Sequence, residues 1–208
     1  MIPRRRPRAK RARGEAARVP VRVLVLGIGN PLRGDDGLGP RLVRALAGAM
    51  PRGCEARCRH GDLLGLLDDC GGFDALVCVD AAAPAGTPGR VHRFDLANGS
   101  LPRNLLPASS HGIGLAEALE LARALGVLPP HVVVHAIEGG GFANGLGVDP
   151  LVAAHSRRVA RRLRCEIRRL TRRAGPPRMS SRTADDAPRR VGAVGGGMLQ
   201  GSQKIDCS

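Results

Sequence analysis

The chain has 208 residues, of which 43% are hydrophobic, but it contains only three Phe and no Tyr or Trp. This length allows one α/β domain with tails, built around an aliphatic core. The scarcity of aromatic rings argues against nucleic-acid binding by base stacking, and no apolar run reaches the roughly 18 residues of a membrane-spanning helix. We therefore expect neither a membrane nor a nucleic acid as partner.

Positive charge is concentrated at the two ends of the chain. The formal net charge of +15 divides into +7 for residues 1–20, −2 for 21–156 and +10 for 157–208. The Pro- and Arg-rich start and the Gly-, Ser- and Pro-rich residues 174–208 have no apolar periodicity, so we predict two disordered basic tails around a domain at 21–173. Basic tails can bind anionic polymers or lipids, but solvated tails without a fixed role are the simpler interpretation.

Between the tails, strands alternate with helices. In chain order, the patterns predict a strand at 21–26, a helix from 38, a weak strand at 55–59, a short helix at 63–67, a strand at 75–79, an edge strand at 90–94, a loop at 96–110, a helix beginning just after 111, a strand at 131–137 and a long helix from 150. This alternation predicts a three-layer α/β fold of the phosphorylase/hydrolase-like kind. Its twisted, mostly parallel sheet would have helices on both faces.

A glycine-rich turn follows the first strand, with the sequence Gly-Ile-Gly-Asn-Pro-Leu-Arg-Gly-Asp-Asp-Gly-Leu-Gly at 27–39. Such turns usually hold phosphate at a helix N-terminus. Here Asp35 and Asp36 already place negative charge at that position and would repel a phosphate. We therefore predict that the turn presents carboxylates, with Asp35 capping the helix and Asp36 acting as a ligand.

Acidic residues follow all three apolar strands. Asp36 lies beyond the first strand, Asp80 directly after the second and Glu138 directly after the third. The carboxyl ends of parallel strands meet at one edge of a sheet, where ligands bind, and the loop residue His111 could reach the same edge. Asp36, Asp80 and His111 would suit a divalent metal such as nickel or zinc, with open positions for water or substrate. Asp35 and Glu138 are secondary candidates.

Simpler structural interpretations exist for each of these residues. Asp36 could cap its helix and have no other role, and Asp80 could serve just to accept a hydrogen bond from the neighbouring turn. His111 could be an ordinary surface residue. The six cysteines form no Cys-x-x-Cys pair, so we expect reduced thiols in a cytoplasmic protein.

With these motifs the chain resembles the hydrogenase maturation endopeptidases, which process the C-terminus of nickel–iron hydrogenase large subunits. The resemblance covers about residues 21–170. It rests on the segments 27–39, 76–81 (Leu-Val-Cys-Val-Asp-Ala), 110–115 (Ser-His-Gly-Ile-Gly-Leu) and 136–139 (Ala-Ile-Glu-Gly).

The resemblance implies a cytoplasmic, monomeric endopeptidase whose Asp36, Asp80 and His111 are both the metal-binding and the catalytic residues. The implied partner is a large-subunit precursor already loaded with nickel, so that nickel comes from the substrate and serves as its recognition element. The enzyme would remove a short C-terminal extension. Many members carry a small pair such as Gly-Thr where this chain has His-Gly-Asp-Leu at 60–63, which leaves the preferred large subunit open.

Other functions fit parts of the pattern. Residues 27–31 also resemble the start of the peptidyl-tRNA hydrolases, but that family continues with Thr-Arg-His-Asn-x-Gly, and here acids replace the histidine. A dinucleotide-binding module would need a third glycine at position 32, which is Leu. A non-catalytic protein that binds nucleotide or nucleic acid, and an inactive relative of the protease, remain alternatives.

Overall fold

The computed structural model describes residues 20–61, 63–102, 113–145, 147–172 and 205–206. In this part of the chain, six strands form one sheet in the order β4-β5-β3-β1-β2-β6. The strands are β1 (Val23–Ile28), β2 (Cys54–Arg59), β3 (Ala75–Ala82), β4 (Val91–Asp95), β5 (His131–Glu138) and β6 (Ile205–Asp206). The four inner strands are parallel, whereas β4 and β6 are antiparallel to their neighbours at the two edges. The predicted mostly parallel sheet with an edge strand near residues 90–94 is therefore confirmed.

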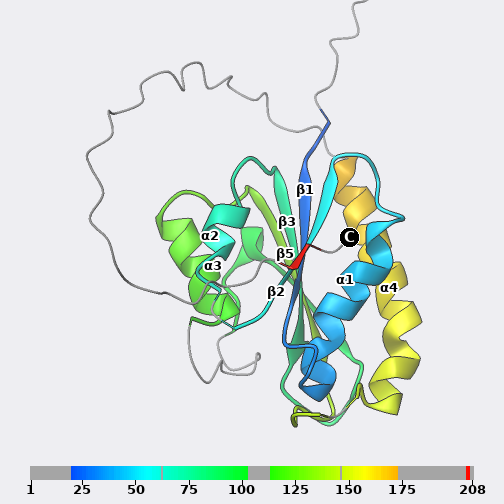
Figure 1. The fold of residues 1–208 in the computed structure, drawn as a ribbon. Coiled ribbons are helices and arrows are strands. Elements are labelled where there is room, and N and C mark those ends of the chain that lie inside the picture. The colour runs from blue at the N-terminus through cyan, green and yellow to red at the C-terminus, as the bar shows by residue number, and fades with distance from the viewer. Residues whose placement is uncertain (1–19, 62, 103–112, 146, 173–204, 207–208) are drawn as a thin grey trace, which may run out of the picture.

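Helices cover both faces of the sheet, as predicted (Figure 1). The helices α1 (Leu38–Ala47) and α4 (Pro150–Thr171) pack on one face, and α2 (Leu66–Asp69) and α3 (Leu115–Ala124) pack on the other. Two short 3₁₀-helices, η1 (Gly34–Gly37) and η2 (Leu96–Asn98), follow β1 and β4. The long helix begins at Pro150 as predicted, and the side chain of Asp149 caps it by accepting the N–H of Leu151.

The core is aliphatic and lies on both sides of the sheet. Every residue of β1 and of β3 is buried, as expected for strands covered on both faces. Successive side chains alternate between the two faces. Leu24 and Leu76 pack toward α2 and α3, whereas Val25 and Val77 pack toward α1 and α4.

Some predicted boundaries were wrong. The first strand begins and ends two residues later than the predicted 21–26. Strand β3 runs on to Ala82, because its pairing with β5 continues as far as the pair Ala82 and Glu138. Asp80 therefore lies inside β3, and Glu138 is the last residue of β5 instead of the first residue after it. An apolar run marks the buried part of a strand, whereas backbone pairing decides its length.

Two further features were not predicted. Ile205 and Asp206, in the predicted C-terminal tail, form β6 against Arg57 and Cys58 of β2. Four cysteines are free, as expected (Cys54, Cys70, Cys78 and Cys165), but Cys58 is disulfide-bonded. None of the helices in the described ranges is both long and apolar enough to span a membrane. Residues 1–19 and 173–204, which make up most of the predicted tails, lie outside the described residues.

Candidate active site

The glycine-rich turn brings η1 against the carboxyl ends of the central strands. Gly29 has a φ of 126°, and a Cβ added there would lie 1.8 Å from the carbonyl oxygen of Asp36. A Cβ added at Gly39 would lie 2.4 Å from the carbonyl oxygens of both Ile28 and Val79. Only glycine fits this close backbone approach. The close approach of the turn to the strands places Asp36 near Asp80 of β3.

Asp36 is half-buried and points back toward the turn. Its Oδ2 accepts the backbone N–H of Asn30 at 3.1 Å, and the Oδ1 of Asn30 accepts the N–H of Leu32 at 2.9 Å. The turn and the carboxylate therefore fix each other's position. Asn30 was not among the predicted site residues, although its place before Pro31 in the turn is a usual signal for such a hydrogen bond.

Asp35 does not cap its own helix, so that prediction was wrong. Neither η1 nor α1 has a side-chain cap. Instead, the fully buried Asp35 accepts three backbone N–H groups from the segment after β5. Its Oδ2 lies 2.7 Å from the nitrogen of Gly140 and 3.0 Å from that of Gly141, and its Oδ1 lies 2.7 Å from the nitrogen of Asp149. Asp35 thus joins η1 to the loop that leads into α4.

Asp80 is buried in the sheet, 7% exposed, and its Oδ1 accepts the N–H of Ala81 at 2.8 Å. Burial raises the pKa of Asp80 to about 8, and the negative charge of Asp36 adds to this effect, against the hydrogen bond from Ala81. Without a cation the Asp80 carboxyl is therefore mostly protonated at neutral pH. A cation between the two carboxylates would favour the ionised form.

Glu138 is also buried but has a different role. Its Oε1 accepts the N–H groups of Ala85, at 2.7 Å, and of Thr87, while its Oε2 lies 3.8 Å from Nε2 of His92. Burial favours the neutral acid, but the donors from Thr87, Ala85 and His92 outweigh it and lower the pKa of Glu138. This carboxylate therefore holds the turn between β3 and β4.

Of the predicted site residues, the structure brings Asp36 and Asp80 together and directs Asp35 and Glu138 at loops. His111 lies outside the described residues. Within the described ranges, no three His, Cys, Asp or Glu side chains form a group that could hold a metal. A hollow of about 570 Å³ beside the Asp36 turn is lined by Asn30, Arg33, Phe142, Ala143 and Asn144. The sequence offered no signal for the last three of these residues, because they belong to an irregular loop.

In fold, the chain is similar to a class of α/β proteins that includes the hydrogenase maturation proteases. The chain superposes on the solution structure of an endopeptidase from Escherichia coli with a TM-score of 0.61 and 26% identity, over 72% of this chain and 93% of that one. The [NiFe] hydrogenase maturation protease HybD from Thermococcus kodakarensis gives a TM-score of 0.56 and 25% identity, over 69% and 99%. The maturating endopeptidase HybD from E. coli, at 23% identity and a TM-score of 0.60 over 72% and 93%, has the same fold.

A curated relative supports the same class by sequence. Over 120 residues the chain is 34% identical to the hydrogenase expression/formation protein HupD from Thiocapsa roseopersicina. The aligned residues make up 56% of this chain and 53% of HupD. The chain thus spans about half the length of this relative. No protein-family model matches this chain. The resemblance that the motifs predicted is confirmed: in sequence and fold, the chain is similar to the hydrogenase maturation proteases.

Proposed function

We propose that this protein is an endopeptidase that removes a short C-terminal extension from a nickel-loaded precursor of a nickel–iron hydrogenase large subunit. The observation that carries the proposal is the pair of carboxylates, Asp36 and Asp80, at the carboxyl edge of the sheet. Support comes from the relatives, which are named as hydrogenase maturation proteases or a hydrogenase formation protein. The chain does not fit a peptidyl-tRNA hydrolase, because Asp35 and Asp36 stand where that family has its histidine.

In this proposal Asp36, Asp80 and His111 bind the nickel that the precursor carries. The two carboxylates suit such a substrate, because neither has an ion pair within the described ranges and the negative charge of Asp36 adds to the raised pKa of Asp80. Nickel would polarise the scissile carbonyl or activate a water. Binding the metal-loaded precursor would release the proton from Asp80, so recognition of nickel and ionisation of the site are coupled.

The surrounding residues position this pair. Asp35 holds η1, and with it Asp36, against the loop after β5. Glu138 holds the turn after β3 through Ala85 and Thr87. The hollow that Arg33 lines opens next to the Asp36 turn and would receive the precursor chain beside the cut. Asp35 and Glu138 therefore act on the site through loop geometry in this proposal.

The test is cleavage of a nickel-loaded large-subunit precursor, followed by intact mass. Wild type should remove one C-terminal peptide, whereas Asp36→Ala, Asp80→Ala and His111→Ala should remove none. Asp68→Ala is the matched control, because Asp68 is an exposed aspartate on α2, and it should cleave at the wild-type rate. Cleavage of nickel-free precursor, or no cleavage by wild type when a related protease cuts the same sample, would overturn the proposal.

A further inference from the structure

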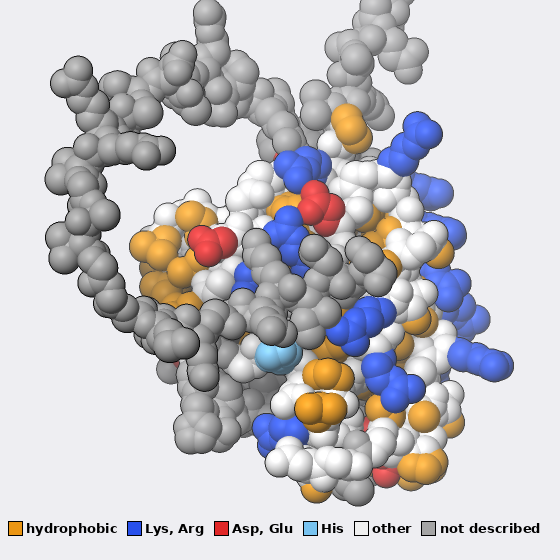
Figure 2. Space-filling model, in the orientation of Figure 1, with side chains coloured by type: hydrophobic (Ala, Val, Ile, Leu, Met, Phe, Trp, Pro, Cys, Tyr) orange, Lys and Arg blue, Asp and Glu red, His pale blue; other side chains and the backbone are white. Residues whose placement is uncertain are grey.

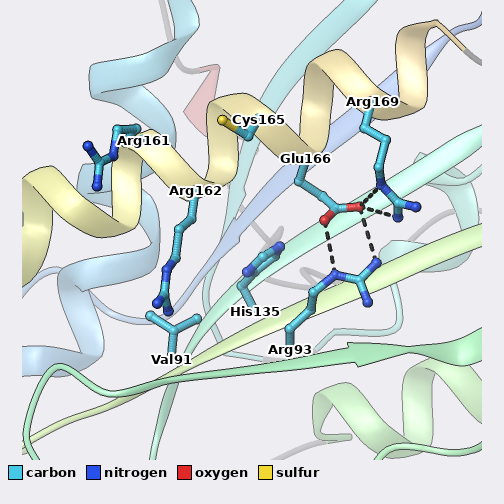
Figure 3. A pocket seen from close by; sticks show the side chains of 8 residues that line it. All are labelled: Val91, Arg93, His135, Arg161, Arg162, Cys165, Glu166 and Arg169. Carbon is cyan, nitrogen blue, oxygen red and sulfur yellow. Dashed lines mark hydrogen bonds and ion pairs between the residues drawn. The ribbon is translucent and has the colours of Figure 1, made fainter.

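A second cavity lies on the other face of the sheet from Asp80. Its volume is about 400 Å³, and it lies between α4 and the neighbouring strands β4 and β5 (Figure 3). On its floor is His135, which pairs in register with Val79, a residue that packs toward α1 and α4. Asp80, the next residue along β3, points to the opposite face. The cavity is therefore separate from the candidate active site.

His135 is an unusual residue for a cavity floor. It is 3% exposed, and neither ring nitrogen has a hydrogen-bond partner among the described residues. Burial lowers the pKa of His135 to about 4; the nearby Glu166 acts against this shift, whereas Arg93 and Arg162 add to it. The ring is therefore neutral at pH 7, with one N–H donor and one acceptor left unpaired. Because unpaired buried polar groups are costly, they indicate a missing partner.

The charges around the cavity are unevenly balanced. On one side, Glu166 accepts hydrogen bonds from Arg93 Nε at 2.9 Å and from Arg169 at 2.6 Å, and Asp95 lies 3.1 Å from Arg93, so these two cations face two anions. On the other side, Arg162 has no ion pair within the described ranges and extends toward Val91 beside His135 (Figure 3). Figure 2 shows Lys and Arg side chains gathered along the edge of the molecule where α4 lies in Figure 1.

We propose that this cavity binds a small organic anion, whose carboxylate or phosphate group lies between Arg162 and His135 and whose apolar part contacts Val91. A guanidinium group can bind either anion through two parallel hydrogen bonds. The imidazole of His135 supplies a further donor, and the cavity has the size of small-molecule sites. The inference does not depend on the proposed protease activity.

Cys165 provides a direct reporter, because it is a free, exposed thiol that lines the cavity. Burial raises the pKa of the Cys70 and Cys78 thiols, so these react more slowly with alkylating reagents. The experiment measures the rate of iodoacetamide labelling at Cys165 by peptide mapping, with inorganic phosphate or citrate as probe and sodium chloride at equal ionic strength as control. A bound anion should slow labelling by about tenfold at ten times its dissociation constant.

Variants decide whether the effect comes from the cavity. Arg162→Gln and His135→Leu should each abolish the protection, whereas Arg157→Gln, an exposed arginine of the same helix outside the cavity lining, should keep it. Protection by citrate alone assigns a carboxylate, and protection by phosphate alone assigns a phosphate. Equal slowing by chloride, no slowing by either probe, or full protection in both cavity variants would overturn the proposal.

Discussion

Replacing Asp80 by Asn tests the electrostatics of the candidate site directly. The pKa of this carboxyl rises from 3.8 to about 8 on folding, chiefly through burial. The folded protein therefore keeps a proton that the unfolded chain releases, and this contribution to stability falls as the pH rises from about 4 to about 8. At about 1.4 kcal/mol per pKa unit, the wild type should lose about 4 kcal/mol by pH 7. That is a large part of the 5–15 kcal/mol typical of native proteins.

Asn has nearly the same shape and keeps an acceptor for the N–H of Ala81, but it does not titrate. The two proteins should therefore be about equally stable near pH 4, and Asp80→Asn should be the more stable by about 4 kcal/mol at pH 7. Urea unfolding followed by far-UV circular dichroism measures the difference, because the chain has no Trp or Tyr for fluorescence. A chelator keeps the samples metal-free. Ionisation of the other groups is common to both proteins and cancels.

A constant difference between the two proteins from pH 4 to pH 8 would refute this reasoning. It would mean that Asp80 has an ordinary pKa when folded and that the Asp36–Asp80 pair does not favour the binding of a cation. An Asp80→Asn protein that loses stability with rising pH as steeply as wild type would lead to the same conclusion.

Four further substitutions have definite expectations. Gly29→Ala should cost several kcal/mol of folding free energy or prevent folding, because its Cβ would lie 1.8 Å from the Asp36 carbonyl oxygen. In the control Gly48→Ala the added carbon meets nothing within 4 Å, so the free energy of unfolding should change by less than about 1 kcal/mol. Urea unfolding compares the two variants, and equal costs would contradict the close packing of the turn. Asp35→Ala should destabilise the protein by about 3 kcal/mol or more, because three N–H groups lose their acceptor, and it should slow precursor cleavage; unchanged unfolding would show that this anchor is dispensable. His135→Leu should raise the free energy of unfolding at pH 7 by about 1–2 kcal/mol by removing unpaired nitrogens. Its advantage over wild type should grow as the pH falls from 6.5 toward about 4, where the unfolded chain binds a proton that the folded ring refuses, and an advantage independent of pH would contradict the lowered pKa.

The sequence was sufficient to predict the order of the elements and the approach of Asp36 to Asp80. Three apolar runs marked the buried strands, and an acid at or near the end of each marked one edge of the sheet. The actual partners of the acids could not be predicted in the same way. Asp35 accepts hydrogen bonds from Gly140 and Asp149, and no local pattern connects residues so far apart in the chain. His135 lies within an apolar strand, where periodicity indicates burial but not whether a polar ring finds a partner.

The hydrogen bonds of Asp35 span 105, 106 and 114 residues of the chain. During synthesis, the first acidic residues of the site therefore leave the ribosome long before the backbone groups that hold them. A nascent chain that has not reached Asp149 lacks one of the three donors and cannot complete the anchor. This anchor also closes a long loop, and the entropy of loop closure must be overcome before such a contact stabilises the fold. An unfinished chain would present the Asp36 turn without this anchor to the loop after β5.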